Sequence, residues 1–272
     1  MFQDIPDSVD IEFDPLPANG GDSVLCFDGR SVLVRIDENR AVLPKLCELV
    51  SGIKTVFAFK ADGIRFFLCL EKACAQGFEF QPLNRIRHVE PDTAQYAVVT
   101  GFHYYCFHME NKFCSVCGAK LEHDGAKRCM VCTGCGNEVY PKIAPAVILG
   151  IIDRETDSIL LTRYADREYK KYALVAGFVE MGESAEAAAK REAMEETGLE
   201  ITDIEYFASQ PWGFAQNLLV GYFAQVKGSR EIKMDTQELS EAVWVKREDV
   251  PAQPGGISLT GEMMWAFKSS QR

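Results

Sequence analysis

Residues 177–199, GFVEMGESAEAAAKREAMEETGL, are the stretch that most constrains how this chain folds. Strong helix formers fill it, Ser184 is a good N-cap, and Gly198 stands where a left-handed C-cap would end a helix. Three carboxylates at positions i, i+3 and i+4 share one face of this helix: Glu192, Glu195 and Glu196. The stretch therefore predicts a helix with a compact acidic face.

The alanines of this helix predict which way the acidic face points. A solvated charge stripe normally lies opposite the apolar residues. Here Ala185, Ala188 and Ala189 project on the same side as the glutamates, and Lys190 and Thr197 lie roughly opposite. Carboxylates that face a protein interior are costly unless a cation compensates them. Oxygen ligands favour Mg²⁺ or Mn²⁺, ions that act together with substrate phosphates, so the pattern indicates a pyrophosphatase site.

Arg191 is a candidate positioning residue for this site. It precedes Glu192 and lies four residues before Glu195, so it can hold a carboxylate by a charge-assisted hydrogen bond. Spacing alone is equally consistent with an ordinary surface ion pair, so both interpretations stay open.

Two pairs of cysteines have the spacing of a zinc ribbon. Each C-x-x-C pair is followed directly by a glycine: Cys114 and Cys117 before Gly118, and Cys132 and Cys135 before Gly136. Four thiolates around a tetrahedral Zn²⁺ ion make a structural site, since catalysis needs an open position. Buried free cysteines and a ribbon that binds nucleic acid are the alternatives. Cys129 forms another C-x-x-C with Cys132, but only Cys132 with Cys135 gives two separate pairs. The isolated histidines are not assigned as zinc ligands: His103, His108 and His123.

The composition limits the compartment and the partners. The net charge of −11 argues against a large surface that tracks nucleic-acid phosphates, although a metal ion lets an acidic site hold a small polyanion. No apolar run approaches the roughly 20 residues needed to span a bilayer. The N-terminal sequence is acidic where a secretory signal would be basic and then apolar, so we expect a cytoplasmic protein with ten reduced cysteines and no membrane partner.

Changes in the residue pattern along the sequence divide the chain into three segments. We expect an N-terminal domain over 1–95, a helix and zinc ribbon over 96–139, and a third domain over 140–272. The first has β-like runs at 31–36, 55–59 and 64–70, and a helix is predicted from Asp92. The third reads as α/β, with predicted strands at 146–152, 159–162, 172–175, 204–208, 218–226 and 242–245, and a final helix over 259–267.

The string around the glutamates resembles the Nudix box, G-x5-E-x7-R-E-U-x-E-E-x-G-U. The positions in register are Gly177, Glu183, Arg191, Glu192, Glu195, Glu196, Gly198 and Leu199. Ala193 departs from the pattern, because a larger aliphatic residue usually stands there. The resemblance implies an α+β fold: a Nudix α/β/α sandwich with a mixed sheet, preceded by a zinc ribbon and a small N-terminal α/β domain.

Two further stretches resemble the NADH pyrophosphatase branch of this family, which carries a four-cysteine zinc ribbon directly before its Nudix domain. Residues 140–145, YPKIAP, resemble the Y-P-R-I-A-P segment of that branch. Residues 209–217, SQPWGFAQN, resemble its S-Q-P-W-P-F-P-x-S signature. Gly213, Ala215 and Asn217 replace Pro, Pro and Ser, so we expect a more flexible loop here and a less secure preference for NADH.

The resemblance implies roles for individual residues. The implied catalytic residues are Arg191, Glu192, Glu195 and Glu196, with Glu196 or Glu195 as the base that activates the water. The implied Mg²⁺ or Mn²⁺ ligands are the backbone carbonyl of Ala176 and the side chains of Glu192, Glu195, Glu196 and Glu238. Tyr140 and Phe178 match aromatic residues that frame the nicotinamide, and Trp212 matches a residue contributed across a dimer; core packing is the alternative for each ring. The implied substrate-binding set is Tyr140, Phe178, Gln210, Pro211, Trp212, Gly213, Phe214, Ala215, Gln216, Asn217 and Thr260.

These features predict a metal-dependent hydrolase that cuts the pyrophosphate of NAD(H) to nicotinamide mononucleotide and AMP. Removal of NAD caps from RNA 5′ ends is a further activity associated with the branch, and we expect a homodimer. One alternative is a Nudix hydrolase for another nucleotide diphosphate derivative, such as ADP-ribose. Another is a binding module that senses a nucleotide without cleaving it, although none of the box glutamates is missing.

Overall fold

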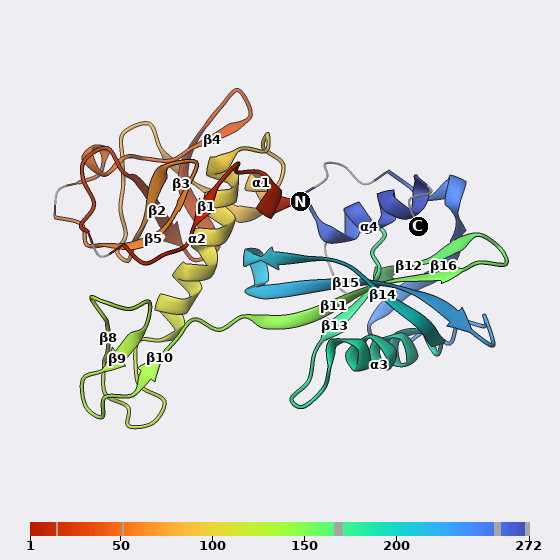
Figure 1. The fold of residues 1–272 in the computed structure, drawn as a ribbon. Coiled ribbons are helices and arrows are strands. Elements are labelled where there is room, and N and C mark those ends of the chain that lie inside the picture. The colour runs from red at the N-terminus through yellow and green to blue at the C-terminus, as the bar shows by residue number, and fades with distance from the viewer. Residues whose placement is uncertain (15, 51, 166–170, 253–256, 270–272) are drawn as a thin grey trace. The chain divides into compact units, whose positions relative to one another are not determined.

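The computed structural model describes every residue except 15, 51, 166–170, 253–256 and 270–272. The chain divides into two compact units (Figure 1). The C-terminal unit comprises Met1–Phe2, Ala144–Pro211 and Asn217–Arg272, and the N-terminal unit comprises Gln3–Ile143 and Trp212–Gln216. None of the helices in the described part of the chain has the length and apolar character needed to cross a bilayer.

A mixed sheet forms the middle of the C-terminal unit. Its strands follow the spatial order β14 (Glu200–Trp212), β15 (Asn217–Lys227), β11 (Ala144–Asp153), β12 (Ser158–Tyr164) and β16 (Leu239–Lys246). The short β13 (Val175–Phe178) also pairs with β11. β11 is parallel to β15 and antiparallel to β12 and β13. The predicted mixed sheet is therefore confirmed.

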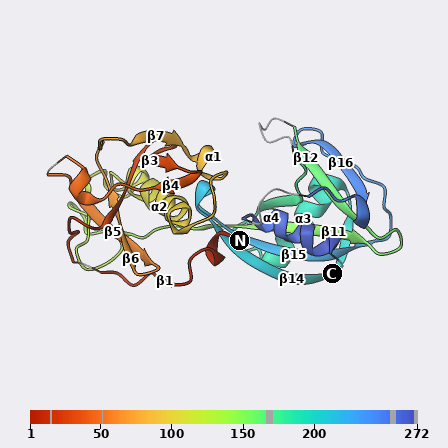
Figure 2. The same ribbon diagram turned by 90° about the horizontal axis from the view of Figure 1, so that it is seen from above.

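Side chains alternate along β11 and build a core on each face of this sheet. Val147, Leu149 and Ile151 pack in one core with the alanines of α3 (Ala185–Thr197). Ile148 and Ile152 pack in the other core with α4 (Leu259–Lys268). Figures 1 and 2 show the two helices on opposite faces of the sheet. This arrangement confirms the predicted α/β/α sandwich.

One predicted strand lies in a different place. We expected a strand over 172–175, but β13 begins at Val175. It pairs with β11 from Val175 opposite Leu149 to Phe178 opposite Ala146. Ala173 makes only an isolated bridge with Thr162. The glycine at 177 therefore lies inside a strand and next to the acidic helix.

The N-terminal unit contains a sheet in the order β1-β5-β6-β2-β3-β4, with β7 paired to β3. Its strands are β1 (Val9–Asp10), β2 (Ser23–Asp28), β3 (Ser31–Asp37), β4 (Arg40–Val42), β5 (Thr55–Ala61), β6 (Ile64–Cys69) and β7 (Glu79–Pro82). α1 (Leu83–Ile86) leads into α2 (Thr93–Glu110), which contacts β2, β4, β5 and β6. The Asp92 side chain accepts a hydrogen bond from the Gln95 backbone N–H at 2.8 Å, so the predicted helix start is confirmed.

A second, three-stranded sheet in this unit carries the cysteine pairs. Its order is β10 (Glu138–Val139), β9 (Met130–Cys132) and β8 (Leu121–His123), all antiparallel. Short 3₁₀ turns complete the described elements at Phe2–Asp4, Leu46–Glu48, Gly213–Ala215 and Arg247–Asp249. The finer division of the first 139 residues into two domains at residue 95 stays a prediction.

Candidate active site and metal centre

Helix α3 presents the predicted catalytic glutamates, and its ends form as the sequence indicates. The Ser184 hydroxyl accepts a hydrogen bond from the Ala187 N–H at 3.2 Å. Gly198 ends the helix in the left-handed conformation with φ of 70°, where a Cβ is unfavourable. Between these caps, Ala188, Ala189 and Ala193 are fully buried against the sheet. The small residue at the departing box position therefore packs the helix close to the strands.

The acidic face is turned inward only in part. The Glu192 and Glu196 residues are 9% and 2% exposed, whereas the Glu195 side chain is 60% exposed. Thr197, which we expected on the outer side, is fully buried and donates its hydroxyl to the Ala193 carbonyl. Thr197 is the last residue of the helix, and its carbonyl accepts a hydrogen bond from the Lys233 N–H at 2.8 Å, so the segment between β15 and β16 lies against this end of α3.

Arg191 ties several groups of the site together. Its guanidinium donates to both oxygens of Glu183 at 3.0 and 2.9 Å, to Glu192 at 2.7 Å and to Glu195 at 2.9 Å. It also donates to the Phe178 carbonyl at 2.8 Å, which links α3 to β13. These bonds raise the pKa of Arg191 and lower that of Glu183. Arg191 is thus a bridge among three carboxylates, not an isolated surface pair.

Glu183 is the member of this network that sequence reasoning left out of the site. The box register contains it, and its distance of eight residues from Arg191 gave no reason on helical spacing to pair the two. It lies before the helix, where its Oε2 also accepts from the Glu180 backbone N–H at 3.1 Å. Its bidentate bond fixes the guanidinium, and the guanidinium in turn fixes Glu192 and Glu195.

Gly177 on β13 leaves room for the Glu192 carboxyl group. A Cβ built on Gly177 would lie 2.0 Å from the Glu192 Cδ, closer than any real contact. Ala176, whose backbone carbonyl is a predicted metal ligand, directly precedes Gly177 on the same strand and lies opposite Ile148 of β11. β13 and α3 therefore bring Ala176 and Glu192 to one part of the C-terminal unit.

The electrostatics of Glu192 indicate a crowded negative site. Burial raises its pKa, the hydrogen bond and charge of Arg191 lower it, and the neighbouring charges of Glu195 and Glu238 raise it further. Glu238 directly precedes β16, and its own carbonyl accepts from the Ala165 N–H at 2.9 Å. A cation among these carboxylates would relieve both the burial and the repulsion.

The predicted aromatic and loop residues lie in different surroundings. Phe178 in the C-terminal unit and Tyr140 in the N-terminal unit are 55% and 50% exposed, and the Tyr140 hydroxyl donates to Glu138 at 2.5 Å. Gln210 is fully buried: its amide N–H donates to the Ile257 carbonyl and its Oε1 accepts from the Leu259 N–H, both at 2.7 Å. Gln210 therefore joins β14 to the start of α4.

The rest of the predicted substrate-binding set is divided between the units. Pro211, Asn217 and Thr260 are in the C-terminal unit, where Asn217 is buried and Thr260 lies in the first turn of α4. The five remaining residues are in the N-terminal unit: Trp212, Gly213, Phe214, Ala215 and Gln216. Phe214 is 6% exposed there. The roles assigned to these residues stay predictions.

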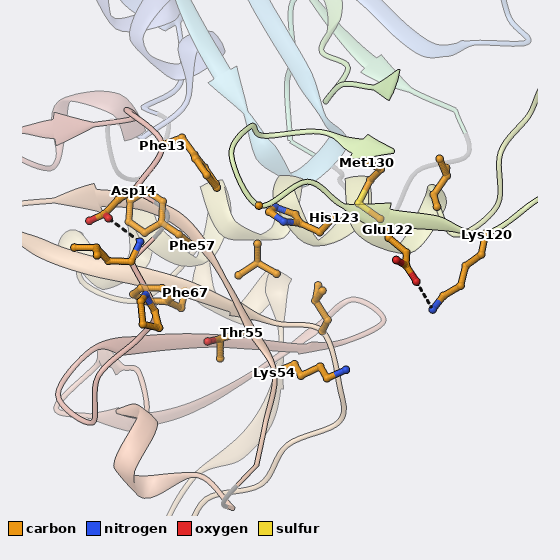
Figure 3. Close-up of a pocket in the computed structure, with 16 residues that line it drawn as sticks. Phe13, Asp14, Lys54, Thr55, Phe57, Phe67, Lys120, Glu122, His123 and Met130 are labelled. Carbon is orange, nitrogen blue, oxygen red and sulfur yellow. Dashed lines mark hydrogen bonds and ion pairs between the residues drawn. The ribbon is translucent and has the colours of Figure 1, made fainter. Parts of the chain in front are cut away.

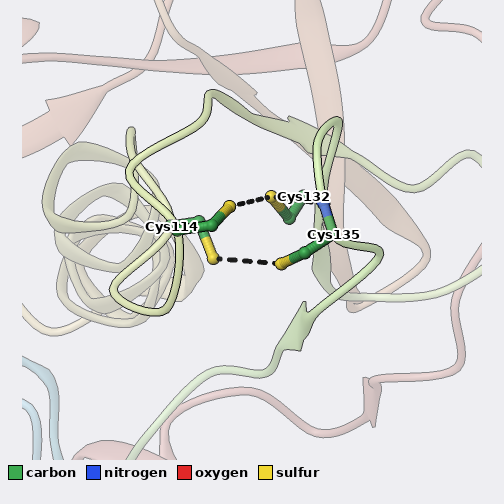
Figure 4. Close-up of side chains that lie close together, drawn as sticks. Cys114, Cys132 and Cys135 are labelled. Atoms are coloured by element: carbon green, nitrogen blue, oxygen red, sulfur yellow. Dashed lines mark hydrogen bonds between the residues drawn. The ribbon is translucent and has the colours of Figure 1, made fainter.

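The four predicted zinc ligands meet at one point in the N-terminal unit (Figure 4). Their sulfur atoms all lie within 4.8 Å of one another, with 3.8 Å between Cys114 and Cys135 and 3.3 Å between Cys117 and Cys132. A tetrahedron of Zn–S bonds of 2.3 Å has edges of about 3.8 Å. The spacing of the thiol groups therefore fits a closed zinc site.

Backbone groups favour the thiolate form of Cys132. Backbone N–H groups of Cys135 and Gly134 donate to the Cys132 sulfur at 3.4 and 3.3 Å and lower the pKa of that thiol to about 6. Gly118 and Gly136 adopt φ of 76° and 73° in the two turns, where a side chain would strain the backbone. Cys129 is buried outside the cluster.

The carboxylates are less tightly gathered than the thiols. Among the residues that the structure describes, the four cysteines are the one group of three or more His, Cys, Asp or Glu side chains whose ligand atoms all lie within 4.8 Å. Glu192 and Glu195 are held instead by their hydrogen bonds to Arg191. The described carboxylates are therefore not gathered around one point as the four thiols are.

A separate cavity of about 650 Å³ lies in the N-terminal unit, lined by parts of β5 and β6 and of the ribbon (Figure 3). The rings of Phe57 and Phe67 meet edge to face at 5.6 Å on its wall, and Lys120 pairs with Glu122 at 3.4 Å. None of the predicted catalytic, substrate-binding or zinc residues is among the described residues that line it. This cavity is therefore distinct from the predicted sites.

Comparisons with known proteins agree with this geometry. Two family models match: the NADH pyrophosphatase zinc ribbon domain at residues 110–140 and the NUDIX domain at residues 142–263. The "NAD-capped RNA hydrolase NudC" of Salmonella typhi is 40% identical over 148 residues, 54% of this chain and 56% of that protein. The protein of the same description from Photobacterium profundum is 41% identical over 140 residues, 52% of each chain. This chain thus matches about half the length of these relatives.

A solved structure supports the fold alone. The crystal structure of a NUDIX hydrolase from Nitrosomonas europaea matches with a TM-score of 0.50 and 21% identity, covering 59% of this chain and 92% of that chain. The acidic helix with its Arg191 network lies inside the matched NUDIX range, and the four cysteines lie inside the matched ribbon range. The chain therefore carries an NADH pyrophosphatase zinc ribbon domain followed by a Nudix domain.

Proposed function

We propose that this protein hydrolyses the pyrophosphate bond of NAD(H) to nicotinamide mononucleotide and AMP, and that it also removes NAD caps from RNA 5′ ends. The observation that carries the proposal is the set of Arg191-linked carboxylates in a Nudix domain that directly follows an NADH pyrophosphatase zinc ribbon. Relatives described as NAD-capped RNA hydrolases support the substrate class. An NAD cap carries the same pyrophosphate-linked dinucleotide as NAD(H).

The donor set fits a hard divalent cation, Mg²⁺ or Mn²⁺. Glu192, Glu195, Glu196 and Glu238 would hold it together with the Ala176 carbonyl, and all of these ligands offer oxygen. Burial and mutual repulsion raise the pKa of Glu192, which a bound cation would offset. When bound, the cation supplies charge neutralisation of phosphate oxygens and a lower pKa for the attacking water.

The protein's own groups then have three tasks. Glu196 or Glu195 accepts the proton of the water whose oxygen forms a new bond to phosphorus, as the bond from that phosphorus to the bridging oxygen breaks. Arg191 keeps Glu192 and Glu195 in position through its bonds of 2.7 and 2.9 Å. Phe178, with a half-exposed ring on β13, is available to stack on the nicotinamide.

We further propose that the protein is a cytoplasmic homodimer to which Trp212 contributes, and that Thr260 lies near the nucleotide. Sedimentation at several protein concentrations tests the dimer, and a Trp212→Ala variant should shift the sedimentation coefficient toward that of a monomer. The zinc ribbon has the separate task of stabilising the N-terminal unit, because four thiolates leave no open coordination position.

A substrate panel tests the proposed function. The purified protein with Mg²⁺ or Mn²⁺ is given NADH, NAD⁺, ADP-ribose, diadenosine polyphosphates and NAD-capped RNA, and AMP or capless RNA is measured. We expect the highest kcat/KM with NAD(H) or the NAD cap. A higher kcat/KM with ADP-ribose would assign another Nudix specificity, and binding of NADH without turnover would support a nucleotide sensor.

A further inference from the structure

The predicted substrate loop, residues 209–217, does not belong to one unit. Its ends continue into β14 and β15, but the five central residues, Trp212–Gln216, belong to the N-terminal unit. Two of these five residues, Gly213 and Ala215, differ from the branch signature.

The backbone of Gly213 lies directly on helix α2. A Cβ at this position would be 2.1 Å from the Val99 carbonyl oxygen, so only glycine permits the approach. The proline of the branch signature would also bring a side chain to this contact. The substitution that suggested a more flexible loop is therefore the one that lets the loop pack closely on the helix.

Arg87 and Arg30 of the N-terminal unit hold the two aromatic residues of this segment. The Arg87 guanidinium carbon is 5.1 Å from the centre of the Trp212 ring and 5.6 Å from that of Phe214, within the range of cation–π contacts. The two rings are 5.1 Å apart. Arg30 donates from both terminal nitrogens to the Phe214 carbonyl, at 3.2 and 3.3 Å.

A further contact holds the end of the segment. The Gln216 side-chain amide donates to Glu110 at the last turn of α2, at 3.0 Å. Gln216 itself has a left-handed φ of 60°, a conformation that a non-glycine residue keeps only where its surroundings hold it. The segment is therefore anchored at its beginning, its middle and its end.

We propose that Arg87 and Arg30 are positioning residues for the substrate loop, so that the N-terminal unit sets the affinity for the nicotinamide dinucleotide without contributing a metal ligand. This inference rests on the proposed function. A loop ordered in advance does not lose that conformational freedom on binding, which strengthens binding in the ground state and the transition state alike. Loss of the anchor should thus raise KM much more than it lowers kcat.

The experiment uses the full-length protein and two readouts. Hydrogen–deuterium exchange of the backbone amides in 212–217 reports on the loop, and NADH turnover in Mn²⁺ gives KM and kcat. Arg87→Met removes the charge and the planar group but keeps the length of the side chain. Arg85→Met is the matched control, because Arg85 lies two residues away and is exposed, with its hydrogen bond directed to Gln81 at 2.7 Å.

We expect Arg87→Met to speed exchange in 212–217 about tenfold and to raise KM about tenfold, with kcat within about twofold of wild type. Arg87→Lys should restore part of both changes, and Arg30→Gln should repeat them independently. Arg85→Met should change neither. Exchange in 185–198, within and beside α3, should stay the same in every variant, which separates loop release from general loss of structure.

Two results would overturn the inference. Unchanged exchange in both arginine variants would show that they do not anchor the segment. Faster exchange with KM within about twofold of wild type would show that the anchor has no bearing on substrate. If wild-type protein failed to hydrolyse NADH, the proposed function and the assigned ligand would fall together, while exchange in 212–217 would still decide whether the arginines anchor the loop.

Discussion

The cysteine cluster and the carboxylate helix are both predicted metal sites, yet the structure organises them in opposite ways. The four sulfur atoms lie within 4.8 Å of one another, and those of Cys114 and Cys132 accept hydrogen bonds from backbone N–H groups. The carboxylates share one helix, but Arg191 holds two of them and one of these is largely exposed. The ribbon is a closed site in which the metal stabilises the fold. In the proposed function, the helix is an open site in which metal and substrate phosphates would complete the coordination together.

The largest expected effect comes from breaking the closed site. Cys132→Ser should abolish stoichiometric zinc binding and unfold the ribbon, because structural zinc in small domains contributes about 10–16 kcal/mol at neutral pH. Zinc content by mass spectrometry and thermal unfolding measure this. Cys129→Ser is the matched control: Cys129 is buried three residues away but outside the cluster, so it should keep one zinc per chain. Equal zinc loss from both variants would contradict the ligand assignment.

Gly177→Ala tests the open site with a single methyl group. The added Cβ would meet the Glu192 carboxyl group at 2.0 Å, so the glutamate must move away from β13. A displacement of this size should lower kcat/KM about a hundredfold and cost about 1–3 kcal/mol of unfolding free energy. Gly125→Ala is the control, because no atom lies within 4 Å of its built Cβ. Wild-type kinetics in Gly177→Ala would show that the position of Glu192 does not matter.

The smallest expected effect is a pH dependence confined to the N-terminal unit. Burial, and to a smaller extent the charge of His123, lower the pKa of His108 to about 4. The unfolded chain binds the proton from about pH 6.5 downward and the folded chain does not, so stability falls as pH decreases through this window. Between pH 7 and pH 5 the loss should be on the order of 2 kcal/mol.

Comparison of variants isolates this contribution from acid release of zinc, which all of them share. His108→Phe keeps an aromatic ring and should remove the His108 part of the slope in chemical unfolding, whereas His88→Gln at an exposed position should leave the slope unchanged. A wild-type slope in His108→Phe would mean that His108 is already protonated in the folded chain.

Local features of both sites could be predicted from the sequence because local chemistry determines them. Ser184 and Gly198 cap α3, and the two glycines after the cysteine pairs take the positive φ that their turns require. The apolar residues 146–152 predicted a strand, which lies within β11 and is buried. In each case the residues that decide the structure are neighbours in the chain.

Features that depend on distant residues could not be predicted in this way. The Thr197 carbonyl bonds to Lys233 in the segment between β15 and β16, and Gln210 bonds to the start of α4, 49 residues away in the chain. The contact of Gly213 with Val99 joins segments that no local pattern relates. The family resemblance predicted that residues 209–217 bind substrate. The structure identifies the side chains that contact this loop, Arg87 and Arg30.

The central claim is that the carboxylate helix performs the chemistry while the ribbon is structural. The most direct test is kcat of Glu196→Gln with NADH in Mn²⁺, measured beside its zinc content, with the exposed Glu200→Gln as control. We expect a loss of about a hundredfold or more in Glu196→Gln, with one zinc per chain retained and the control unchanged. A kcat within about threefold of wild type would contradict it.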